Sequence, residues 1–448
     1  MKAIAYVLAP LLHLTTLAGQ TSAQPQPAAD LPMQTPVQGA RDRQDKHTNH
    51  PDAQWFPDAG LGLFIHWGMA SVGAKGEIYY EMFANKSWSQ VTITPNQYYA
   101  RAERWKPERM DFDRMLAGAK SAGFTYAVLV TKHWDGFTLW PSAFGEIGTK
   151  RTFGGRDFVK EFTDACRKNG LKVGLYYAPP DAWFDRQYMS FSMSGPALDM
   201  NHKPVTLPAK PKDHDAKRAE MIRGHVRELL TQYGKIDLFW FDGGGGEMPY
   251  SEIRQLQPGV VVNRRNGPGG DFDDTERKMP TSRFKGWFEM CDTSWPAGKW
   301  SYTEDYGWDS APQVLEKLVK LRAWGGNLLT NLGPKGDGSV PDQATAAWQE
   351  MAAWMKHSRE SVIGAGPGPF PEAVNAPVTT GKGVAYLHLL PGFRDEVIWK
   401  DAPRPEKALL LRTQEPVSFR YEDGTLRLTV PASARTQNDD VVKVIMAN

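Results

Sequence analysis

Short apolar runs alternate with helical patterns along most of this chain, and this alternation constrains its fold more than any other feature. Runs typical of buried strands lie at residues 61–67, 125–134, 172–179, 236–242, 259–265, 286–291 and 325–334. Amphipathic stretches lie between several of them, at residues 112–123, 155–170, 217–234 and 311–325. Strands that are apolar on both faces and alternate with such helices indicate a parallel sheet wrapped by helices. The pattern predicts an α/β fold, a (β/α)8-like barrel, with an open doubly wound sheet as the alternative.

The pattern changes beyond "GAGPGPFP" at residues 364–371. Short segments of alternating polarity follow, joined by turns that contain Pro, Gly and Asp. This pattern is typical of antiparallel strands. We therefore expect the barrel to occupy residues 51–365 and a small C-terminal antiparallel β-sandwich to occupy residues 366–448. The tripeptide "EDG" at residues 422–424 is the expected turn of a hairpin.

The first residues have the features of a secretory signal peptide. Lys2 supplies a positive charge, residues 3–17 are mostly apolar, and small residues at 21–23 suit a cleavage site. We expect a signal peptide over residues 1–23, with a retained membrane anchor as the alternative. The protein would then be exported to the periplasm or the extracellular space, or to the lysosome in a eukaryotic cell, with no membrane attachment after cleavage. Residues 24–50 are rich in Pro, Gln and charge and predict a disordered leader.

Composition excludes several classes of function. Lys and Arg number 53 against 51 Asp and Glu, and no long basic run is present, so nucleic acid is not an expected partner. The two cysteines, Cys166 and Cys291, cannot form a disulfide framework or a cysteine-based zinc site, and the histidines are scattered. We expect no metal and no cofactor. The 16 Trp suit flat surfaces for ring-shaped ligands such as sugars.

The stretch "IDLFWFDGGGG" at residues 236–246 marks the first candidate catalytic group. An apolar strand ends on Asp242, at the end of a parallel strand where barrel enzymes carry their active sites. The four glycines that follow leave room for a substrate ring to approach the carboxylate. An Asx turn that opens a glycine loop is the alternative reading of Asp242.

A second carboxylate, Glu289, ends another apolar run. Trp287 and Phe288 precede it, and apolar surroundings raise the pKa of a carboxyl group so that it can act as an acid. A surface glutamate on a strand edge is the alternative. Further polar and aromatic residues at strand ends are His66, His133, Trp134, Tyr176, Tyr177 and Arg265. Two carboxylates with imidazole, guanidinium and aromatic groups are typical of a carbohydrate hydrolase, although the histidines could equally be core residues and Arg265 a surface charge.

Several ordered motifs resemble those of the α-L-fucosidases of glycoside hydrolase family 29. The similar segments are "GLFIHWG", "AVLVTKHWDGFTLWPS", "GLYYAP", "LFWFDGG", "VVVNRR" and "GGNLLTNLGPKGDGSVP". The resemblance implies a distorted (β/α)-barrel followed by a β-sandwich, with Asp242 as the nucleophile. It also implies that His66, His133, Tyr176 or Tyr177, and Arg265 contact the sugar. We expect Trp240 of the nucleophile strand, Glu77 and Trp134 to bind the substrate as well.

The resemblance leaves the acid/base residue less closely defined, because this position varies within the family. "WFEMC" is similar to a Trp-Glu-x-Cys arrangement and assigns Glu289, with Glu304 as the alternative. Trp134 stands where the family usually has a second histidine. Glu77 keeps the glutamate of a Glu-Trp-Tyr motif that reads Glu-Ile-Tyr in this chain.

The function that the resemblance implies is retaining hydrolysis of terminal α-L-fucosyl residues from fucosylated oligosaccharides or glycoconjugates. In such a mechanism Asp242 attacks the anomeric carbon while Glu289 protonates the leaving oxygen. Two alternatives remain at this point. One is a glycosidase for a fucose-like sugar such as an α-L-galactoside, and the other is a carbohydrate-binding protein without catalytic activity.

Overall fold

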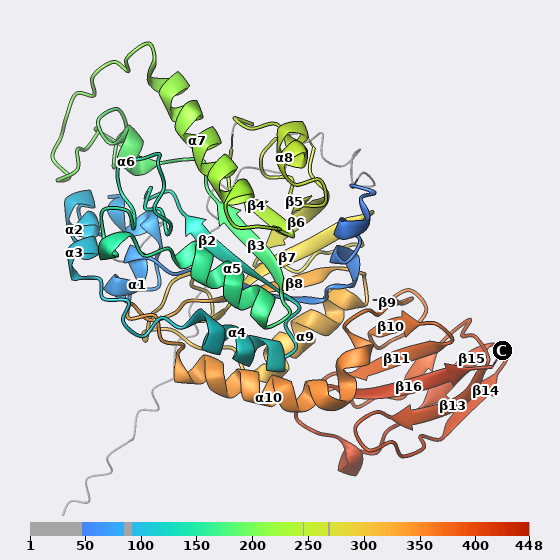
Figure 1. Ribbon diagram of the computed structural model, residues 1–448. Helices are drawn as coiled ribbons and strands as arrows, with labels where there is room; N and C mark the ends of the chain where they lie inside the picture. Colours follow the sequence, from blue (N-terminus) through green and yellow to red (C-terminus); the bar gives the residue numbers. More distant parts are fainter. Residues whose placement is uncertain (1–46, 85–91, 245, 268, 448) are drawn as a thin grey trace, which may run out of the picture. The chain divides into compact units, whose positions relative to one another are not determined.

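The computed structural model describes residues 47–84, 92–244, 246–267 and 269–447. The predicted signal peptide and residues 24–46 of the predicted leader lie outside the described residues. Within the described part of the chain, eight strands form one parallel sheet (Figure 1). They are β1 Leu61–Ile65, β2 Tyr126–Lys132, β3 Lys172–Tyr177, β4 Leu238–Phe241, β5 Val261–Val262, β6 Phe272–Glu276, β7 Trp287–Trp295 and β8 Asn327–Leu332.

The sheet closes almost completely into a barrel. Its strand order is β5-β4-β3-β2-β1-β8-β7-β6, so β5 and β6 are the two ends of the sheet. A parallel bridge between Asn263 and Phe272 joins these ends. The carboxylate of Asp271 also accepts the backbone N–H of Val262 at 2.8 Å. The predicted (β/α)8-like barrel is therefore confirmed.

Helices pack around the outside of the strands (Figure 1). The longer ones are α4 Phe112–Ser121, α5 Phe158–Lys168, α7 His214–Thr231, α9 Ala311–Arg322 and α10 Asp342–Ser358. Shorter ones are α1 Met69–Gly73, α2 Pro95–Tyr99, α3 Arg101–Arg104, α6 Ala182–Asp185 and α8 Tyr250–Leu256. Asp111 and Asp157 cap α4 and α5 by accepting backbone N–H groups of the first turn, which explains where these two helices begin. The four helices expected from periodicity are confirmed, whereas α10 and the strand β6 were not predicted.

Successive side chains of the barrel strands point into the barrel and out toward the helices in turn. Phe64, Tyr126, Tyr176 and Trp240 belong to one buried cluster inside the barrel. Their neighbours Ile65, Tyr177 and Phe241 belong to a second cluster between the strands and the helices. This alternation decides which strand-end residues can reach a ligand at the barrel mouth.

The C-terminal strands form two antiparallel sheets. One has the order β13-β16-β11-β10-β9 and the other has the order β12-β15-β14. Their bounds are β9 Gly366–Pro367, β10 Val378–Gly381, β11 Val384–Leu389, β12 Val397–Trp399, β13 Pro405–Leu410, β14 Phe419–Glu422, β15 Thr425–Leu428 and β16 Asp440–Met446. The predicted β-sandwich is confirmed, while the division of the chain at residues 365 and 366 stays a prediction.

The expected hairpin turn joins β14 to β15. Asp423 and Gly424 connect the paired residues Glu422 and Thr425, with φ angles of 48° and 74°. Two successive positive φ angles are typical of a type I′ turn, for which Asp-Gly is a preferred sequence. The turn prediction is therefore confirmed.

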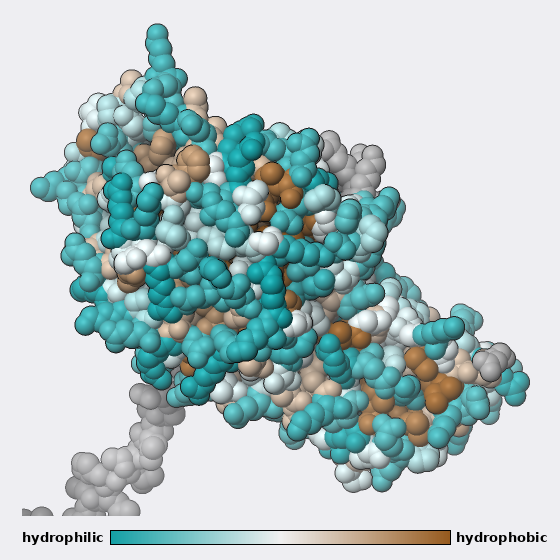
Figure 2. Space-filling model, in the orientation of Figure 1, coloured by the Kyte–Doolittle hydropathy of each residue, from teal (hydrophilic) through white to brown (hydrophobic). Residues whose placement is uncertain are grey.

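The face of the molecule in Figure 2 is mostly hydrophilic, with smaller hydrophobic areas. Among the described residues, no helix combines the length and apolar character needed to cross a membrane. Cys166 and Cys291 are both buried free thiols.

Two glycines test the packing that supports the barrel interior. A β-carbon on Gly62 of β1 would lie 2.1 Å from the Tyr126 ring, whereas one on Gly118 of α4 would lie 3.5 Å from Trp348. We expect Gly62→Ala to lower the free energy of unfolding by about 1–3 kcal/mol, because the buried ring must move. The control Gly118→Ala should be neutral or stabilising by up to about 1 kcal/mol, because a helix favours alanine over glycine. Urea unfolding measures both, and equal effects of the two substitutions would contradict this description of the packing.

Candidate active site

The ends of β4, β5 and β6 bring three charged residues to one mouth of the barrel. Asp242 follows β4 directly, Arg265 follows β5, and Glu276 is the last residue of β6. Asn263 holds the end of β4: its side-chain amide accepts the N–H of Phe241 and donates to the carbonyl of Phe241, both at 2.8 Å. The segment after β5 therefore fixes the backbone from which Asp242 projects.

The glycines after Asp242 have a local structural reason. Gly243 has a φ of +69°, in the left-handed region that favours glycine. A β-carbon on Gly244 would lie 2.6 Å from Oδ1 of Asn266. The chain can therefore turn sharply and pack closely just after the carboxylate.

The Asp242 carboxylate is hydrogen-bonded at both oxygens. The hydroxyl of Tyr176 donates to Oδ2 at 2.7 Å, and Nη1 of Arg265 donates to Oδ1 at 2.9 Å. Burial raises the pKa of Asp242, but the positive charge of Arg265 and the Tyr176 hydrogen bond outweigh burial and hold the pKa below its usual value. Asp242 is therefore ionised at neutral pH, as its predicted role of nucleophile requires.

His133 orients Tyr176. The N–H of Trp134 donates to Nδ1 of His133 at 2.8 Å, so this nitrogen carries no proton. Nε2 lies 2.9 Å from the Tyr176 hydroxyl, whose own proton is directed to Asp242, so Nε2–H is the donor. Burial lowers the pKa of His133 to about 3, which keeps the ring neutral. Both ring nitrogens thus have hydrogen-bond partners within the protein, and the contact of His133 with a sugar stays a prediction.

His66, in contrast, can present an acceptor to a ligand. Nδ2 of Asn331 donates to the carbonyl of Trp300 at 2.7 Å, so Oδ1 of Asn331 faces Nδ1 of His66, also at 2.7 Å. His66 therefore donates from Nδ1. Burial lowers the pKa of His66 to about 4, and the neutral ring carries a lone pair on Nε2. A sugar hydroxyl could donate to this nitrogen.

Arg265 connects the carboxylates of the site. Besides Asp242, its guanidinium donates to Oδ1 of Asp274 and to Oε2 of Glu276, and it lies 4.5 Å from the centre of the Trp240 ring. Asp274 and Glu276 were missed by the sequence analysis, because "FDDTE" contains a single apolar residue and gives no strand signal. The available signal was the pair of acids two positions apart, Asp274 and Glu276, in a polar segment that begins seven residues after the "VVVNRR" motif ends at residue 265.

Glu276 lies close to Asp242 and has the opposite pKa shift. Nη1 of Arg265 is 2.9 Å from Oδ1 of Asp242 and 3.3 Å from Oε2 of Glu276, so these two oxygens are at most about 6 Å apart. Burial raises the pKa of Glu276, and the negative charge of Asp242 raises it further against the opposing effect of Arg265. One carboxyl group is therefore kept ionised while its neighbour is biased toward the protonated form.

Glu289, the acid/base predicted from sequence, lies inside the barrel. It is the third residue of β7, its exposed fraction is 0%, and it pairs in register with Asn327, the first residue of β8. Tyr126 donates to one carboxylate oxygen at 2.5 Å and Trp240 donates to the other at 3.0 Å. Burial raises the pKa of Glu289 to about 7. The shift would suit an acid, but both oxygens are directed at neighbours within the buried interior.

Tyr177 does not belong to the site. It points from β3 toward the helices, where its hydroxyl donates to Nδ1 of His225 at 3.0 Å. Its predicted role as a sugar ligand is therefore wrong, because neighbouring residues of a strand face opposite sides. Tyr176 faces the barrel interior and is the tyrosine that contacts Asp242.

The remaining predicted residues, Trp134, Glu77 and Glu304, each contact another side chain. Trp134 stacks on Tyr79 with ring centres 5.0 Å apart and an interplanar angle of 8°. Glu77 forms an ion pair with Lys299. Glu304 is exposed and accepts the hydroxyl of Tyr302 at 2.5 Å.

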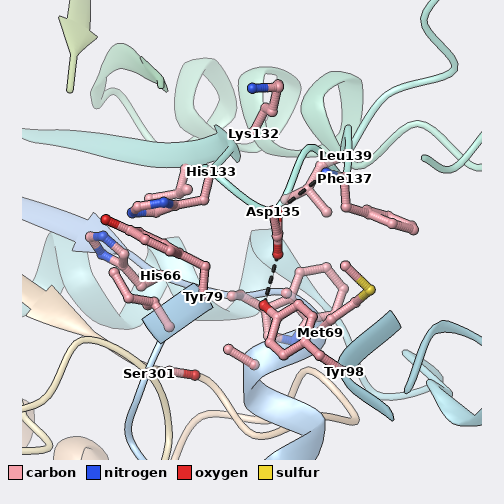
Figure 3. Close-up of a pocket in the computed structure, with 15 residues that line it drawn as sticks. His66, Met69, Tyr79, Tyr98, Lys132, His133, Asp135, Phe137, Leu139 and Ser301 are labelled. Carbon is pink, nitrogen blue, oxygen red and sulfur yellow. Dashed lines mark hydrogen bonds between the residues drawn. The ribbon is translucent and has the colours of Figure 1, made fainter. Parts of the chain in front are cut away.

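A pocket lined by residues at the ends of β1 and β2 and in the segments that follow them is drawn in Figure 3. His66, Tyr79 and His133 line one part of it, and its walls are otherwise mostly apolar. Asp135 lines another part and accepts the hydroxyl of Tyr98 at 2.8 Å. Across the described residues, no group of three or more His, Cys, Asp or Glu is arranged to hold a metal ion.

A barrel whose mouth carries two nearby carboxyl groups with opposed pKa shifts, beside imidazole and phenol groups, is typical of a glycoside hydrolase. Comparison with known proteins identifies the family. The model of the α-L-fucosidase family matches residues 33–360. The chain belongs to the α-L-fucosidase family and is a glycoside hydrolase, which confirms the resemblance found in its motifs.

Individual relatives agree with this assignment. The chain is 28% identical over 399 residues to the tissue α-L-fucosidase of Rattus norvegicus, covering 80% of this chain and 81% of the relative. It is 28% identical over 363 residues to the plasma α-L-fucosidase of the same species, covering 70% of each chain. Among solved structures, α-L-fucosidase isoenzyme 1 from Paenibacillus thiaminolyticus has a TM-score of 0.77 and 27% identity, covering 89% of this chain and 99% of that chain.

Adjacent tyrosines provide a matched test of the site. Tyr176→Phe removes a hydrogen bond to Asp242, so we expect a kcat loss of roughly 10- to 100-fold, because the carboxylate is less well oriented. The pKa of Asp242 should also rise, which shifts the acid limb of the kcat/KM profile to higher pH. Tyr177→Phe should leave both quantities nearly unchanged. Assays of an aryl glycoside across pH compare the variants, and a loss in Tyr177→Phe as large as that in Tyr176→Phe would contradict the assignment.

Proposed function

We propose that the protein hydrolyses terminal α-L-fucosyl residues of fucosylated oligosaccharides or glycoconjugates with retention of anomeric configuration. The observation that carries the proposal is the Asp242–Arg265–Glu276 arrangement, in which one guanidinium contacts two carboxyl groups with opposed pKa shifts. Retaining glycosidases hold their two carboxyl groups about 5–5.5 Å apart, whereas inverting ones need a wider gap for a water molecule. The upper bound of about 6 Å between these oxygens supports the retaining mechanism.

In the first step Asp242 attacks the anomeric carbon and forms a covalent ester, while the bond to the leaving oxygen breaks and Glu276 donates its proton to that oxygen. In the second step the ionised Glu276 takes a proton from water, whose oxygen attacks the anomeric carbon and releases Asp242. Nε2 of His66 accepts a hydrogen bond from a hydroxyl group of the sugar. Arg265 keeps Asp242 ionised and ready to attack.

Glu276 is a better candidate for the acid/base than the two glutamates suggested by sequence. A general acid must reach the leaving oxygen, so geometry takes precedence over pKa. Glu289 is fully buried with both oxygens occupied, and Glu304 is exposed. Glu276 is the one of the three that shares the guanidinium of Arg265 with Asp242.

We also propose that the protein is exported through the signal peptide predicted over residues 1–23. Support comes from the charge and apolar pattern of that segment. A relative named plasma α-L-fucosidase is consistent with this proposal.

The nucleophile is tested by Asp242→Asn. We expect turnover of an aryl α-L-fucoside to fall by several orders of magnitude with unchanged thermal unfolding, because the neutral amide cannot form the ester. NMR of the wild-type reaction should show α-L-fucose as the first product. Initial release of β-L-fucose, or near-normal turnover by the variant, would reject the mechanism.

The acid/base is tested by Glu276→Gln, with Glu304→Gln as the control. The variant should hydrolyse fucosides of poor leaving groups roughly 10²- to 10⁴-fold more slowly, and its defect should be much smaller for the first step with activated aryl fucosides. In the wild type kcat/KM should fall as the pH rises through the raised pKa of Glu276. This alkaline limb should be lost in Glu276→Gln and kept in Glu304→Gln. The opposite pattern would assign the acid to Glu304.

A further inference from the structure

A buried carboxyl group that the proposed mechanism does not use lies beneath the site. Glu289 has an exposed fraction of 0% and contacts two aromatic donors. One is Tyr126, which is itself fully buried at the start of β2. The other is Trp240 of β4, two residues before Asp242. An acidic side chain is rarely fully buried unless it is hydrogen-bonded or paired, as Glu289 is by these two donors.

The indole of Trp240 supports both groups that hydrogen-bond the nucleophile. Its ring stacks on Tyr176 with centres 5.6 Å apart and an interplanar angle of 18°. The guanidinium carbon of Arg265 lies 4.5 Å from the centre of the same ring. Tyr176 and Arg265 in turn bond the two oxygens of Asp242. A rotation of the indole would therefore disturb both contacts at once.

Glu289 determines the orientation of that indole. The only polar atom of a tryptophan side chain is Nε1–H, and here it donates to Oε1 of Glu289 at 3.0 Å. The hydroxyl of Tyr126 donates to the other carboxylate oxygen of Glu289. The hydrogen bond from Tyr126 thus fixes the carboxylate, and the hydrogen bond from Trp240 fixes the orientation of the indole ring.

We propose that Glu289 is a positioning residue, which fixes the plane of Trp240 and through it the Tyr176 and Arg265 contacts to Asp242. This role rests on the proposed function of Asp242 as nucleophile. Charged neighbours of Glu289 are Asp274, its register partner on β6, and Arg265. The role differs from proton donation, because Glu289 acts without touching the substrate.

Two substitutions at this position separate the possibilities. Glu289→Gln keeps an amide oxygen that can accept from Trp240, while its NH₂ group can donate to the hydroxyl of Tyr126. Glu289→Met has a similar length but provides no comparable acceptor, so the indole N–H loses its partner. A positioning role therefore predicts that nucleophilic attack by Asp242 keeps its rate in Glu289→Gln and slows in Glu289→Met. An acid/base role predicts instead that both variants lose turnover of fucosides with poor leaving groups while attack on an activated fluoride is kept.

The readout is the rate at which 2-deoxy-2-fluoro-fucosyl fluoride labels Asp242, followed by mass spectrometry at saturating reagent. In this reaction the Asp242 oxygen forms a bond to the anomeric carbon and the carbon–fluorine bond breaks. Fluoride leaves without a proton from the enzyme, so the rate reports the nucleophile and not the acid. We expect Glu289→Gln to label within about three-fold of wild type and Glu289→Met to label roughly 10- to 100-fold more slowly.

A second variant covers the case in which Glu289→Met does not fold. Trp240→Phe keeps a ring in place but removes the N–H, and it should slow labelling to a similar extent.

The outcomes distinguish the hypotheses. Loss of the alkaline limb of kcat/KM in Glu289→Gln would make Glu289 the acid/base and overturn the proposal. Unchanged labelling in Glu289→Met with only a lower Tm, or unchanged labelling in Trp240→Phe, would leave Glu289 a purely structural group and overturn it as well. If the wild type itself is not labelled at Asp242, the proposed function fails instead.

Discussion

The contact between the Arg265 guanidinium and the carboxylates around it is the interaction on which the rest of the site depends. Arg265 contacts Asp242, Asp274 and Glu276. Burial by itself would raise the pKa of Asp242 and of Glu276 and favour their neutral forms. The guanidinium stays charged at all relevant pH values, and burying this charge has a free-energy cost. Hydrogen bonds and ion pairs with the carboxylates offset that cost. Because Asp242 receives an additional hydrogen bond from Tyr176, the balance favours the charged form at Asp242. The negative charge of Asp242 raises the pKa of Glu276 and so favours the protonated form of Glu276.

The closure of the barrel makes this contact possible. Arg265 follows β5 and its acidic partners lie on β6, and these two strands are the ends of the sheet. They are joined by the Asn263–Phe272 bridge, and Asn263 also holds the backbone of β4 just before Asp242. The same few residues therefore close the barrel and bring the charged groups together. Inside the barrel, the Trp240 ring packs against Arg265 and Tyr176. Its indole N–H donates to Glu289.

Sequence patterns predicted the architecture well because seven of the barrel strands are apolar and the main helices are amphipathic. They missed β6, whose polarity follows from its contribution to the site rather than to the core. They also left Tyr176 and Tyr177 undecided, since the face of a strand that points inward depends on how the barrel closes. The apolar neighbours of Glu289 correctly indicate that it is buried. Glu289 is, however, the third residue of the nine-residue strand β7, so it lies inside the barrel and not at its mouth. The acid at the barrel mouth, Glu276, lies instead in the polar strand β6, which has no hydrophobic periodicity.

The most direct test is a crystal structure of the enzyme trapped with 2-deoxy-2-fluoro-fucosyl fluoride. We expect a sugar bonded through its anomeric carbon to Asp242, with the Glu276 carboxyl group nearest to that carbon on the side from which the leaving group departs. Glu289 should remain hydrogen-bonded to Trp240, out of contact with the sugar. A sugar bonded to another residue, or a carboxyl group of Glu289 or Glu304 in the place assigned to Glu276, would contradict the proposed mechanism.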